Sequence, residues 1–277
     1  MKMKNAIVTG ATGFVGRHLT AEIAARGVIV TPLKRGELPA TPADVCYHLA
    51  WESASGPGRG DAVLQAGNAA LTLETLRAAY KVGCQKFVSL GTVYEFLPLP
   101  DAVGISDFYI LSKRYSHAMA DRLARQLGID FVWCTVCHPI GRGIKPEQMM
   151  AYAVSNLLKG VSPAFGLAKT WYDVVAVEDL ALGLRLAGEY RLSKREYFIG
   201  SGQPRVLRDY LTQLPHILGV SDKVNIGARP DDGLRFQREW FDIAPLAAET
   251  GYSPQLGFEQ AVKNVGEACD EWPIFST

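Results

Sequence analysis

A tyrosine and a lysine four residues apart, Tyr109 and Lys113 in "DFYILSKRYSHAMA", are residue types that can transfer protons. Residues at this spacing share one face of a helix. A phenol with a pKa of about 10 is a poor proton donor or acceptor at neutral pH. A neighbouring ammonium favours the phenolate and brings proton transfer into range. The pair predicts an acid–base site, although the spacing also fits an ordinary amphipathic helix with a half-buried tyrosine.

A glycine-rich turn, "VTGATGFVG", lies between the first expected strand and the first expected helix. Gly10 permits a tight exit from the strand, Gly13 lets a pyrophosphate approach the backbone, and Gly16 lets the helix pack closely. The helix N-terminus adds partial positive charge beneath the phosphates. The turn therefore predicts a dinucleotide site. Its candidate residues are Gly10, Thr12, Gly13, Phe14, Val15 and Gly16.

Two cations, Lys34 and Arg35, follow an apolar run that predicts a buried second strand over residues 28–33. In a dinucleotide-binding fold the end of this strand meets the adenosine ribose. An acid there accepts hydrogen bonds from the 2′-hydroxyl of NAD, and a cation accommodates the 2′-phosphate of NADP. The two residues favour NADPH, with NAD as the alternative if they are simply solvated.

Short apolar runs alternate with helical patterns over the first two thirds of the chain, which predicts an α/β fold with a doubly wound parallel sheet of the Rossmann type. We expect this sheet to be buried on both faces. Further along, glycine- and proline-marked loops alternate with short helices. We expect a dinucleotide-binding domain over 1–160 and a mainly substrate-binding lobe over 161–277, with a segment near 173–200 returning to the core. This smaller C-terminal lobe is expected over the carboxyl ends of the strands. Expected strands are 5–10, 28–33, 43–50, 86–91 and 130–137; expected helices are 14–27, 61–82, 109–127, 147–159, 178–190, 205–218 and 257–271.

The composition excludes several other classes of protein. The 277 residues carry a net charge of +1, so nothing indicates nucleic-acid binding. No apolar run approaches the roughly 20 residues of a membrane helix, and the N-terminus lacks signal-peptide anatomy, so we expect a cytoplasmic protein. Five scattered cysteines predict buried thiols rather than disulfides or a metal site.

Taken together, these motifs resemble the extended short-chain dehydrogenase/reductase family, in its NAD-dependent epimerase/dehydratase group that acts on nucleotide sugars. The resemblance rests on "TGATGFVG", "DVCYHLA", Tyr109 with Lys113, "HPIGRG", "DVVAVEDLALGL", "YFIGSGQP", "GARPDDG" and "FDIAPLAAETGYSPQLGFEQAV". It implies a nucleotide-diphosphate sugar as substrate and a homodimer formed through helices 61–82 and 109–127.

The family's third catalytic residue is a Ser or Thr, and "FVSLGTVYEF" allows two alignments. Matching "TVY" to the family's pattern places Leu90 there, and matching "GTVYEF" to a variant pattern places Thr92 there. Leucine cannot donate a hydrogen bond to a substrate oxygen, so chemistry favours Thr92, with Ser89 in reserve. The alternative is that these hydroxyls have no catalytic role and simply cap the end of the strand.

The resemblance implies further site residues. Arg229 resembles the arginine that holds the diphosphate, His138 stands where many relatives have Asn, and Trp51 could wall the substrate or be core. The cofactor residues beyond the glycine turn are Lys34, Arg35, Leu49, Ala50, Lys113 and His138. The substrate residues are Trp51, Thr92, Tyr109, His138, Arg142, Trp171 and Arg229, with Lys145 and Phe165 as further loop candidates.

Three chemistries fit this set of residues. Family dehydratases follow the catalytic Thr with an Asp–Glu pair, whereas Val93 and Tyr94 stand here. The leading hypothesis is an NADPH-dependent reductase of a nucleotide-linked keto sugar, at C4 of a 4-keto-6-deoxyhexose. An NAD-dependent nucleotide-sugar epimerase and a non-catalytic NADP-sensing protein are the alternatives. For a coupled epimerase/reductase, Cys137 with His138 would have to supply a second acid–base pair.

Overall fold

A parallel six-stranded sheet forms the centre of the computed structural model, which describes residues 3–99, 104 and 106–269. The strand order is β10-β5-β4-β3-β1-β2, and every neighbouring pair is parallel. This confirms the predicted Rossmann-type α/β fold. The strands are β1 (Asn5–Thr9), β2 (Ile29–Leu33), β3 (Val45–His48), β4 (Lys86–Leu90), β5 (Asp130–Thr135) and β10 (Glu196–Phe198).

By its internal contacts the chain divides into two compact units whose segments alternate along the sequence. The sheet unit takes in the chain up to Val136 together with Leu180–Ile199 and Ile243–Ser253. The second unit takes in Cys137–Asp179, Gly200–Asp242 and the chain from Pro254 on. The domain boundary expected near residue 160 stays a prediction.

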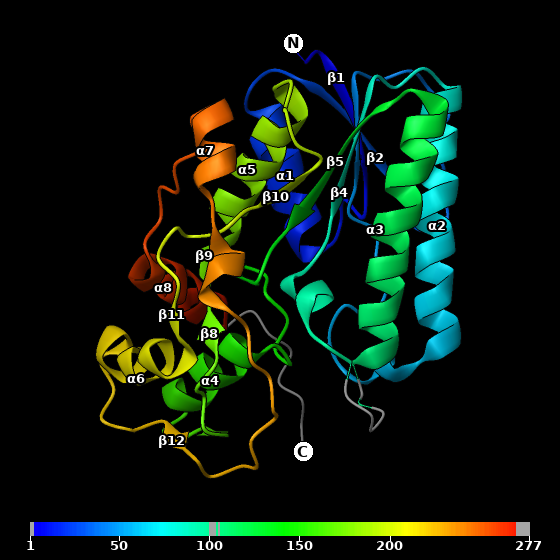
Figure 1. Ribbon diagram of the computed structural model, residues 1–277. Helices are drawn as coiled ribbons and strands as arrows, with labels where there is room; N and C mark the ends of the chain where they lie inside the picture. The colour runs from blue at the N-terminus through cyan, green and yellow to red at the C-terminus, as the bar shows by residue number, and fades with distance from the viewer. Residues whose placement is uncertain (1–2, 100–103, 105, 270–277) are drawn as a thin grey trace. The chain divides into compact units, whose positions relative to one another are not determined.

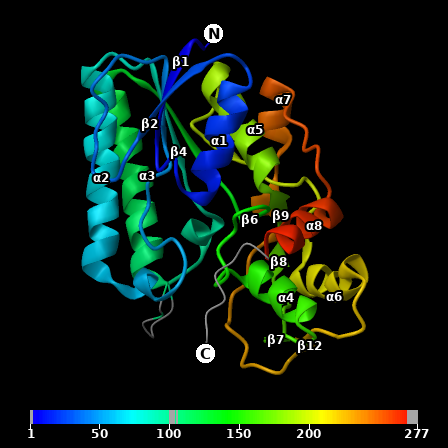
Figure 2. The same cartoon turned by 180° about the vertical axis from the view of Figure 1, so that it is seen from behind.

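Helices cover both faces of the sheet. Figures 1 and 2 show α2 and α3 side by side along one face and α1 with most of α5 along the other. The connection from β2 to β3 contains no helix, as expected from its length. The helices and 3-10 turns of this unit are α1 (Phe14–Ala24), η1 (Pro57–Gly60), α2 (Ala62–Lys81), η2 (Val93–Phe96), α3 (Asp107–Leu127), the larger part of α5 (Val177–Glu189) and α7 (Ala244–Thr250).

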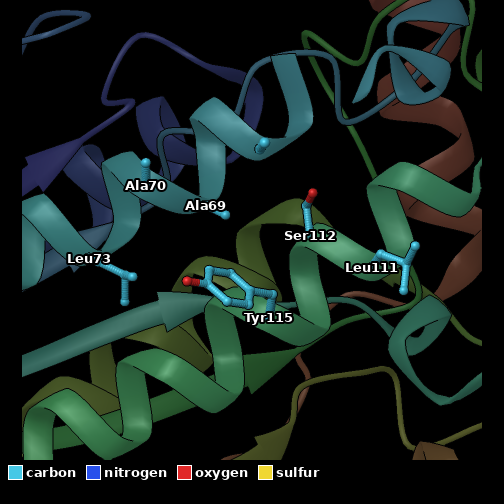
Figure 3. Close-up of a pocket in the computed structure, with 7 residues that line it drawn as sticks. Ala69, Ala70, Leu73, Leu111, Ser112 and Tyr115 are labelled. Atoms are coloured by element: carbon cyan, nitrogen blue, oxygen red, sulfur yellow. The ribbon is translucent and has the colours of Figure 1, made fainter. Parts of the chain in front are cut away.

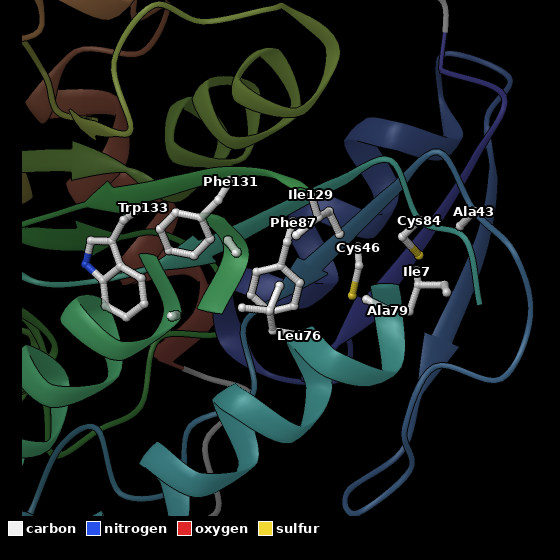
Figure 4. Close-up of a cluster of buried hydrophobic side chains, with 12 residues drawn as sticks. Ile7, Ala43, Cys46, Leu76, Ala79, Cys84, Phe87, Ile129, Phe131 and Trp133 are labelled. Atoms are coloured by element: carbon white, nitrogen blue, oxygen red, sulfur yellow. The ribbon is translucent and has the colours of Figure 1, made fainter. Parts of the chain in front are cut away.

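The face beneath α2 and α3 holds an aromatic core (Figure 4). Phe131 and Trp133 are two apart on β5 and so project to the same side of the sheet. Phe87 of β4 stacks on Phe131 with ring centroids 6.3 Å apart. Each such side chain contributes about 1.5–3 kcal/mol when it is fully buried. This packing fixes α3, which carries the predicted catalytic pair, against the sheet.

The prediction that the second strand, residues 28–33, is buried is wrong for β2. This strand lies at the edge of the sheet, where it pairs only with β1. Ile29 is 71% exposed, and Pro32, which has no N–H to donate, suits an edge position. Lys34 and Arg35 therefore follow an exposed strand, and their charge needs no anionic partner to offset burial.

The described part of the second unit consists of short strand pairs and three helices. Strand β6 (His138–Ile140) pairs with β9 (Val174–Ala176), β7 (Ala164–Phe165) with β12 (Asn225–Ile226), and β8 (Trp171–Tyr172) with β11 (Arg205–Val206). The helices are α4 (Met149–Leu158), α6 (Leu207–Leu218) and α8 (Phe258–Cys269), with a 3-10 turn η3 (Arg238–Phe241). The last two residues of the helix expected over 257–271 lie outside the described residues. In the described part of the chain, no helix combines the length and apolar character that crossing a membrane requires.

Candidate active site

Tyr109, Thr92 and Lys113 lie together in the sheet unit, and all three are buried. Helix α3 begins at Asp107, whose carboxylate accepts a hydrogen bond from the Gly104 N–H at 2.7 Å. This start places Tyr109 and Lys113 in the first two turns on one helix face. The Thr92 side chain lies close enough to the Tyr109 phenol to lower its pKa, and Tyr94, two residues along, meets the Tyr109 ring edge to face with centroids 6.4 Å apart.

The competing hydroxyl, Ser89, is placed differently. It is 2% exposed, and its Oγ donates to the carbonyl oxygen of His48 on the neighbouring strand at 3.4 Å. Thr92 instead begins the turn η2, where its Oγ1 accepts from the Tyr94 N–H at 3.3 Å. The geometry thus pairs Thr92 rather than Ser89 with the phenol.

The Lys113 ammonium is enclosed by aromatic and backbone groups. It donates to the Leu90 carbonyl oxygen at 2.8 Å and lies 3.7 Å from the ring centroid of Trp51. Burial lowers the pKa of Lys113 to about 7. The negative charge of Glu95 acts to raise this pKa, and the positive charge of Arg59 acts to lower it further. Trp51 also meets Tyr109 edge to face, with centroids 6.1 Å apart, so it contacts both members of the predicted catalytic pair.

The pKa of Tyr109 is raised, chiefly by burial. The nearby charge that most opposes this rise is the Arg59 guanidinium, and the carboxylate of Glu95 adds to the rise. The sequence pattern led us to expect this role from Lys113. The cation that most lowers the pKa of Tyr109 is instead Arg59, because its guanidinium lies against the phenol ring while the lysine ammonium is directed at Leu90 and Trp51.

A buried carboxylate, Glu95, holds the Thr92 turn in place. It accepts hydrogen bonds from the Thr92 N–H at 2.8 Å, the Trp133 indole at 3.2 Å and the His117 Nδ1 at 3.2 Å. A Cβ at Gly91 would overlap the Trp133 indole and the Glu95 carboxylate. Sequence reasoning missed this role, although the Thr-x-x-Glu spacing of a capping box was visible.

The glycine turn is packed as a dinucleotide site requires. Gly10 has φ +67°, and a Cβ there would lie 2.8 Å from the Ala50 nitrogen and 2.9 Å from the Leu49 carbonyl. A Cβ at Gly16 would overlap the Gly10 carbonyl oxygen. Gly13 precedes α1 and provides no side-chain cap for its first N–H groups. The predicted residues Gly10, Leu49 and Ala50 are thus in contact, and the start of α1 suits an anion.

Lys34 and Arg35 are both exposed. Arg35 Nη1 lies 3.2 Å from Glu52 Oε1, with the arginine side chain 80% exposed. An ion pair of this exposure contributes about 0–1 kcal/mol. Arg35 is therefore free to exchange this partner for another anion at little cost. The Lys34 N–H donates to Glu37 Oε2 at 2.8 Å, which places an acid at the same turn.

The candidates in the second unit fall into separate groups. Arg229 donates to the Tyr152 hydroxyl at 2.9 Å, and Tyr152 meets Phe165 edge to face. Trp171 lies beneath the Arg238 guanidinium, and His138 packs against Tyr172. Arg142 and Lys145 are exposed. Of these candidates, the structure therefore brings Arg229 and Phe165 together, because both contact Tyr152.

The two cysteines of the "CTVC" stretch are buried free thiols, as expected. Cys134 lies in β5 and Cys137 follows its end. Burial raises the pKa of Cys137 well above its ordinary value, which makes it a poor proton donor or acceptor at neutral pH. Over residues 3–99, 104 and 106–269, no group of three or more His, Cys, Asp or Glu could hold a metal ion.

Comparison with known proteins places the chain in a family. The model of the NAD dependent epimerase/dehydratase family matches residues 6–200, and the chain belongs to this family. A comparison with curated proteins finds no match.

Solved structures with similar folds span several activities. RMD from Pseudomonas aeruginosa, in complex with NADPH, has a TM-score of 0.81 at 18% identity, covering 97% of this chain and 99% of that one. TunA, an NAD dependent NDP-hexosamine 5,6-dehydratase, has a TM-score of 0.80 at 20% identity, covering 99% and 100%. UDP-glucose 4-epimerase from Thermotoga maritima has a TM-score of 0.78 at 20% identity, covering 96% and 99%.

Proposed function

We propose that this protein is an NADPH-dependent reductase of a nucleotide-linked keto sugar, acting at C4 of a 4-keto-6-deoxyhexose. The observation that carries the proposal is the burial of Thr92 beside the Tyr109 phenol, with Lys113 one helical turn along from Tyr109. A carbonyl oxygen placed between the two hydroxyls would find one positioning donor and one proton donor.

NADPH held at the glycine turn by Gly10, Gly13 and Gly16 would supply a hydride for the carbonyl carbon, and the protein's own residues would handle the proton. Thr92 donates a hydrogen bond to the carbonyl oxygen and orients it. Tyr109 gives its phenolic proton to that oxygen as negative charge develops there, and the phenolate that remains takes a proton from solvent. Lys113 stabilises this phenolate, for which its ammonium must turn from the Leu90 carbonyl towards the phenol oxygen.

The residues that would hold the cofactor lie in the sheet unit, except His138, which belongs to the second unit. Gly10, Gly13 and Gly16 leave room for a pyrophosphate at the start of α1, where any side chain at Gly10 or Gly16 would meet backbone atoms. Lys34 and Arg35 would accommodate a 2′-phosphate. RMD, with its bound NADPH, supports this cofactor. In the second unit, Arg229 is proposed to bind the diphosphate of the sugar nucleotide.

Elimination chemistry is disfavoured at this site. Val93 and Tyr94 follow Thr92 in place of a carboxylate pair. The nearby Glu95 has hydrogen bonds to both of its oxygens, so it is engaged in holding the turn. This leaves hydride and proton transfer as the chemistry that the described side chains support.

A second candidate, an NAD-dependent nucleotide-sugar epimerase, is favoured by Glu37. Its carboxylate is held at the end of β2 by the Lys34 N–H and could serve the 2′-hydroxyl of NAD. Incubating the protein with NADPH and a nucleotide-linked 4-keto-6-deoxy sugar, and following NADPH absorbance, separates the candidates. Steady oxidation supports the reductase. Co-purified NAD with sugar interconversion supports the epimerase, and NADPH binding without turnover on any sugar supports a sensor.

Replacing Thr92 tests the choice of hydroxyl. Thr92→Val removes the donor while keeping the side-chain shape, and we expect kcat to fall about 100-fold, the range for losing one oxyanion donor. Thr92→Ser should retain most activity, because it keeps the hydroxyl. Ser89→Ala is the matched control and should change kcat less than about threefold, since its hydroxyl bonds to His48. A larger loss from Ser89→Ala than from Thr92→Val would reverse the assignment.

We also propose a homodimer through α2 and α3. Leu111, Tyr115 and Met119 form an exposed apolar stripe along α3, and a groove of about 450 Å³ lies between this helix and α2 (Figure 3). The groove is lined by Ala66, Ala69, Ala70, Leu73, Leu111, Ser112 and Tyr115. Charged residues are depleted at the core of such interfaces. Leu111→Arg should therefore halve the mass measured by sedimentation, whereas an unchanged mass would place any interface elsewhere.

A further inference from the structure

The segment between β3 and α2, residues 51–60, is fastened to α2 by buried amides. Gln65 is fully buried, and its Nε2 donates to the Gly58 carbonyl at 2.9 Å, while its Oε1 accepts from the Trp51 indole at 2.9 Å. Asn68 bonds both the N–H and the carbonyl of Glu52 at 2.9 Å. Buried amides of this kind are costly unless satisfied. The hydrogen bonds of these two amides therefore fix the shape of this segment, which we call the β3–α2 loop.

The β3–α2 loop brings one cation to the catalytic phenol. Arg59 lies in the turn η1, and its Nε donates to the Ala54 carbonyl within the same loop at 2.7 Å. Its guanidinium carbon lies 4.4 Å from the ring centroid of Tyr109 and 4.8 Å from that of Tyr94. A Cβ at Gly58 would meet the Ser53 side chain at 2.5 Å, so a glycine is needed for the loop to close this tightly.

We propose that Arg59 is a positioning residue for proton transfer by Tyr109, held against the phenol ring by the β3–α2 loop. The proposal deepens the proposed reductase function and rests on it for its catalytic meaning. A guanidinium stays charged at every working pH, whereas the buried Lys113, with a pKa of about 7, is only partly charged near neutrality. Arg59 thus supplies the permanent positive charge beside the phenol.

The charges around Tyr109 determine the sign of the effect. Arg59 on η1 lowers the pKa of the phenol, Glu95 and Tyr94 on η2 raise it, and Lys113 follows on α3 itself. Because a nearby cation favours the phenolate, removing Arg59 raises the pKa of Tyr109. A phenol with a higher pKa is a weaker acid, so reduction at neutral pH slows.

The test is to titrate Tyr109 in cofactor-free protein, which requires no turnover. The ultraviolet difference between each protein and its Tyr109→Phe partner isolates this phenol from the other tyrosines. Arg59→Gln should raise its pKa by about one unit, the scale of one close charge at partial burial. Arg59→Lys should restore most of the shift, since it keeps the charge. Arg26→Gln, which removes an exposed arginine at the end of α1, should titrate like the native protein.

Turnover provides a second readout. With a nucleotide-linked 4-keto-6-deoxy sugar, Arg59→Gln should lower kcat about tenfold at neutral pH, and the alkaline limb of the rate profile should move to higher pH. An unchanged titration of Tyr109 in folded Arg59→Gln overturns the proposal. If Arg59→Gln does not fold, the pKa of Tyr109 is compared between Arg59→Lys, which keeps the charge, and Arg59→Met, which removes it. Equal pKa values of Tyr109 in these two variants also overturn the proposal. A native protein without turnover refutes the reductase and leaves the titration as an independent result.

Discussion

Replacing Tyr109 by Phe should abolish sugar reduction while leaving the protein folded and able to bind NADPH. The change removes only the phenolic oxygen, which is the proton donor of the proposed step. General acid catalysis contributes about 10²- to 10⁴-fold, so we expect kcat to fall about 1,000-fold. The measurement is the initial rate of NADPH oxidation, with the cofactor Kd determined in parallel by fluorescence.

The matched control is Tyr190→Phe, which removes a hydroxyl from a tyrosine that is 43% exposed after α5. This variant should turn over at the native rate. Full activity in Tyr109→Phe, with unchanged stability, would show that another group donates the proton. A loss of NADPH binding in that variant would show instead that Tyr109 acts mainly through the cofactor.

The second large effect is expected from Gly16→Ala. A Cβ at this position would overlap the Gly10 carbonyl oxygen, and backbone cannot move aside as a flexible side chain can. Helix α1 would have to shift from the sheet, which displaces the N–H groups proposed to face the pyrophosphate. We expect NADPH affinity to fall more than about 100-fold, with a loss of about 1–3 kcal/mol in unfolding free energy for an overpacked site.

Gly67→Ala is the control for this substitution. Gly67 lies within α2, and a Cβ there meets nothing within 4 Å. Alanine is the better helix former by about 1 kcal/mol, so this variant should gain stability and bind NADPH as the native protein does. Native affinity in Gly16→Ala would contradict the placement of the cofactor at this turn.

The helix that carries Tyr109 and Lys113, and the close packing of the glycine turn, were predictable because local rules determine them. Tyr109 and Lys113 share a face at any helical geometry, and Gly10 and Gly16 occupy a strand–turn–helix context in which close packing requires glycine. The alternation of apolar runs and helical patterns indicated the parallel sheet. In each of these cases the residues that decide the structure are neighbours in the sequence.

The remaining features depend on which elements become neighbours in space. The exposure of β2 follows from its edge position, which an apolar run does not reveal. Arg59 reaches Tyr109 only because Gln65 and Asn68 fasten the β3–α2 loop, and both amides appear in the sequence as ordinary polar helix residues. The burial of Glu95 likewise depends on Trp133 and His117, which lie 38 and 22 residues away along the chain.

The most direct test of the reductase is to follow the hydride itself. The protein is incubated with NADPH that carries deuterium at the transferring position and with a nucleotide-linked 4-keto-6-deoxy sugar, and the product is examined by NMR and mass spectrometry. The proposed function predicts one deuterium at C4 of the sugar for each NADPH oxidised. A sugar that interconverts without gaining deuterium, with NAD retained on the protein, would contradict it.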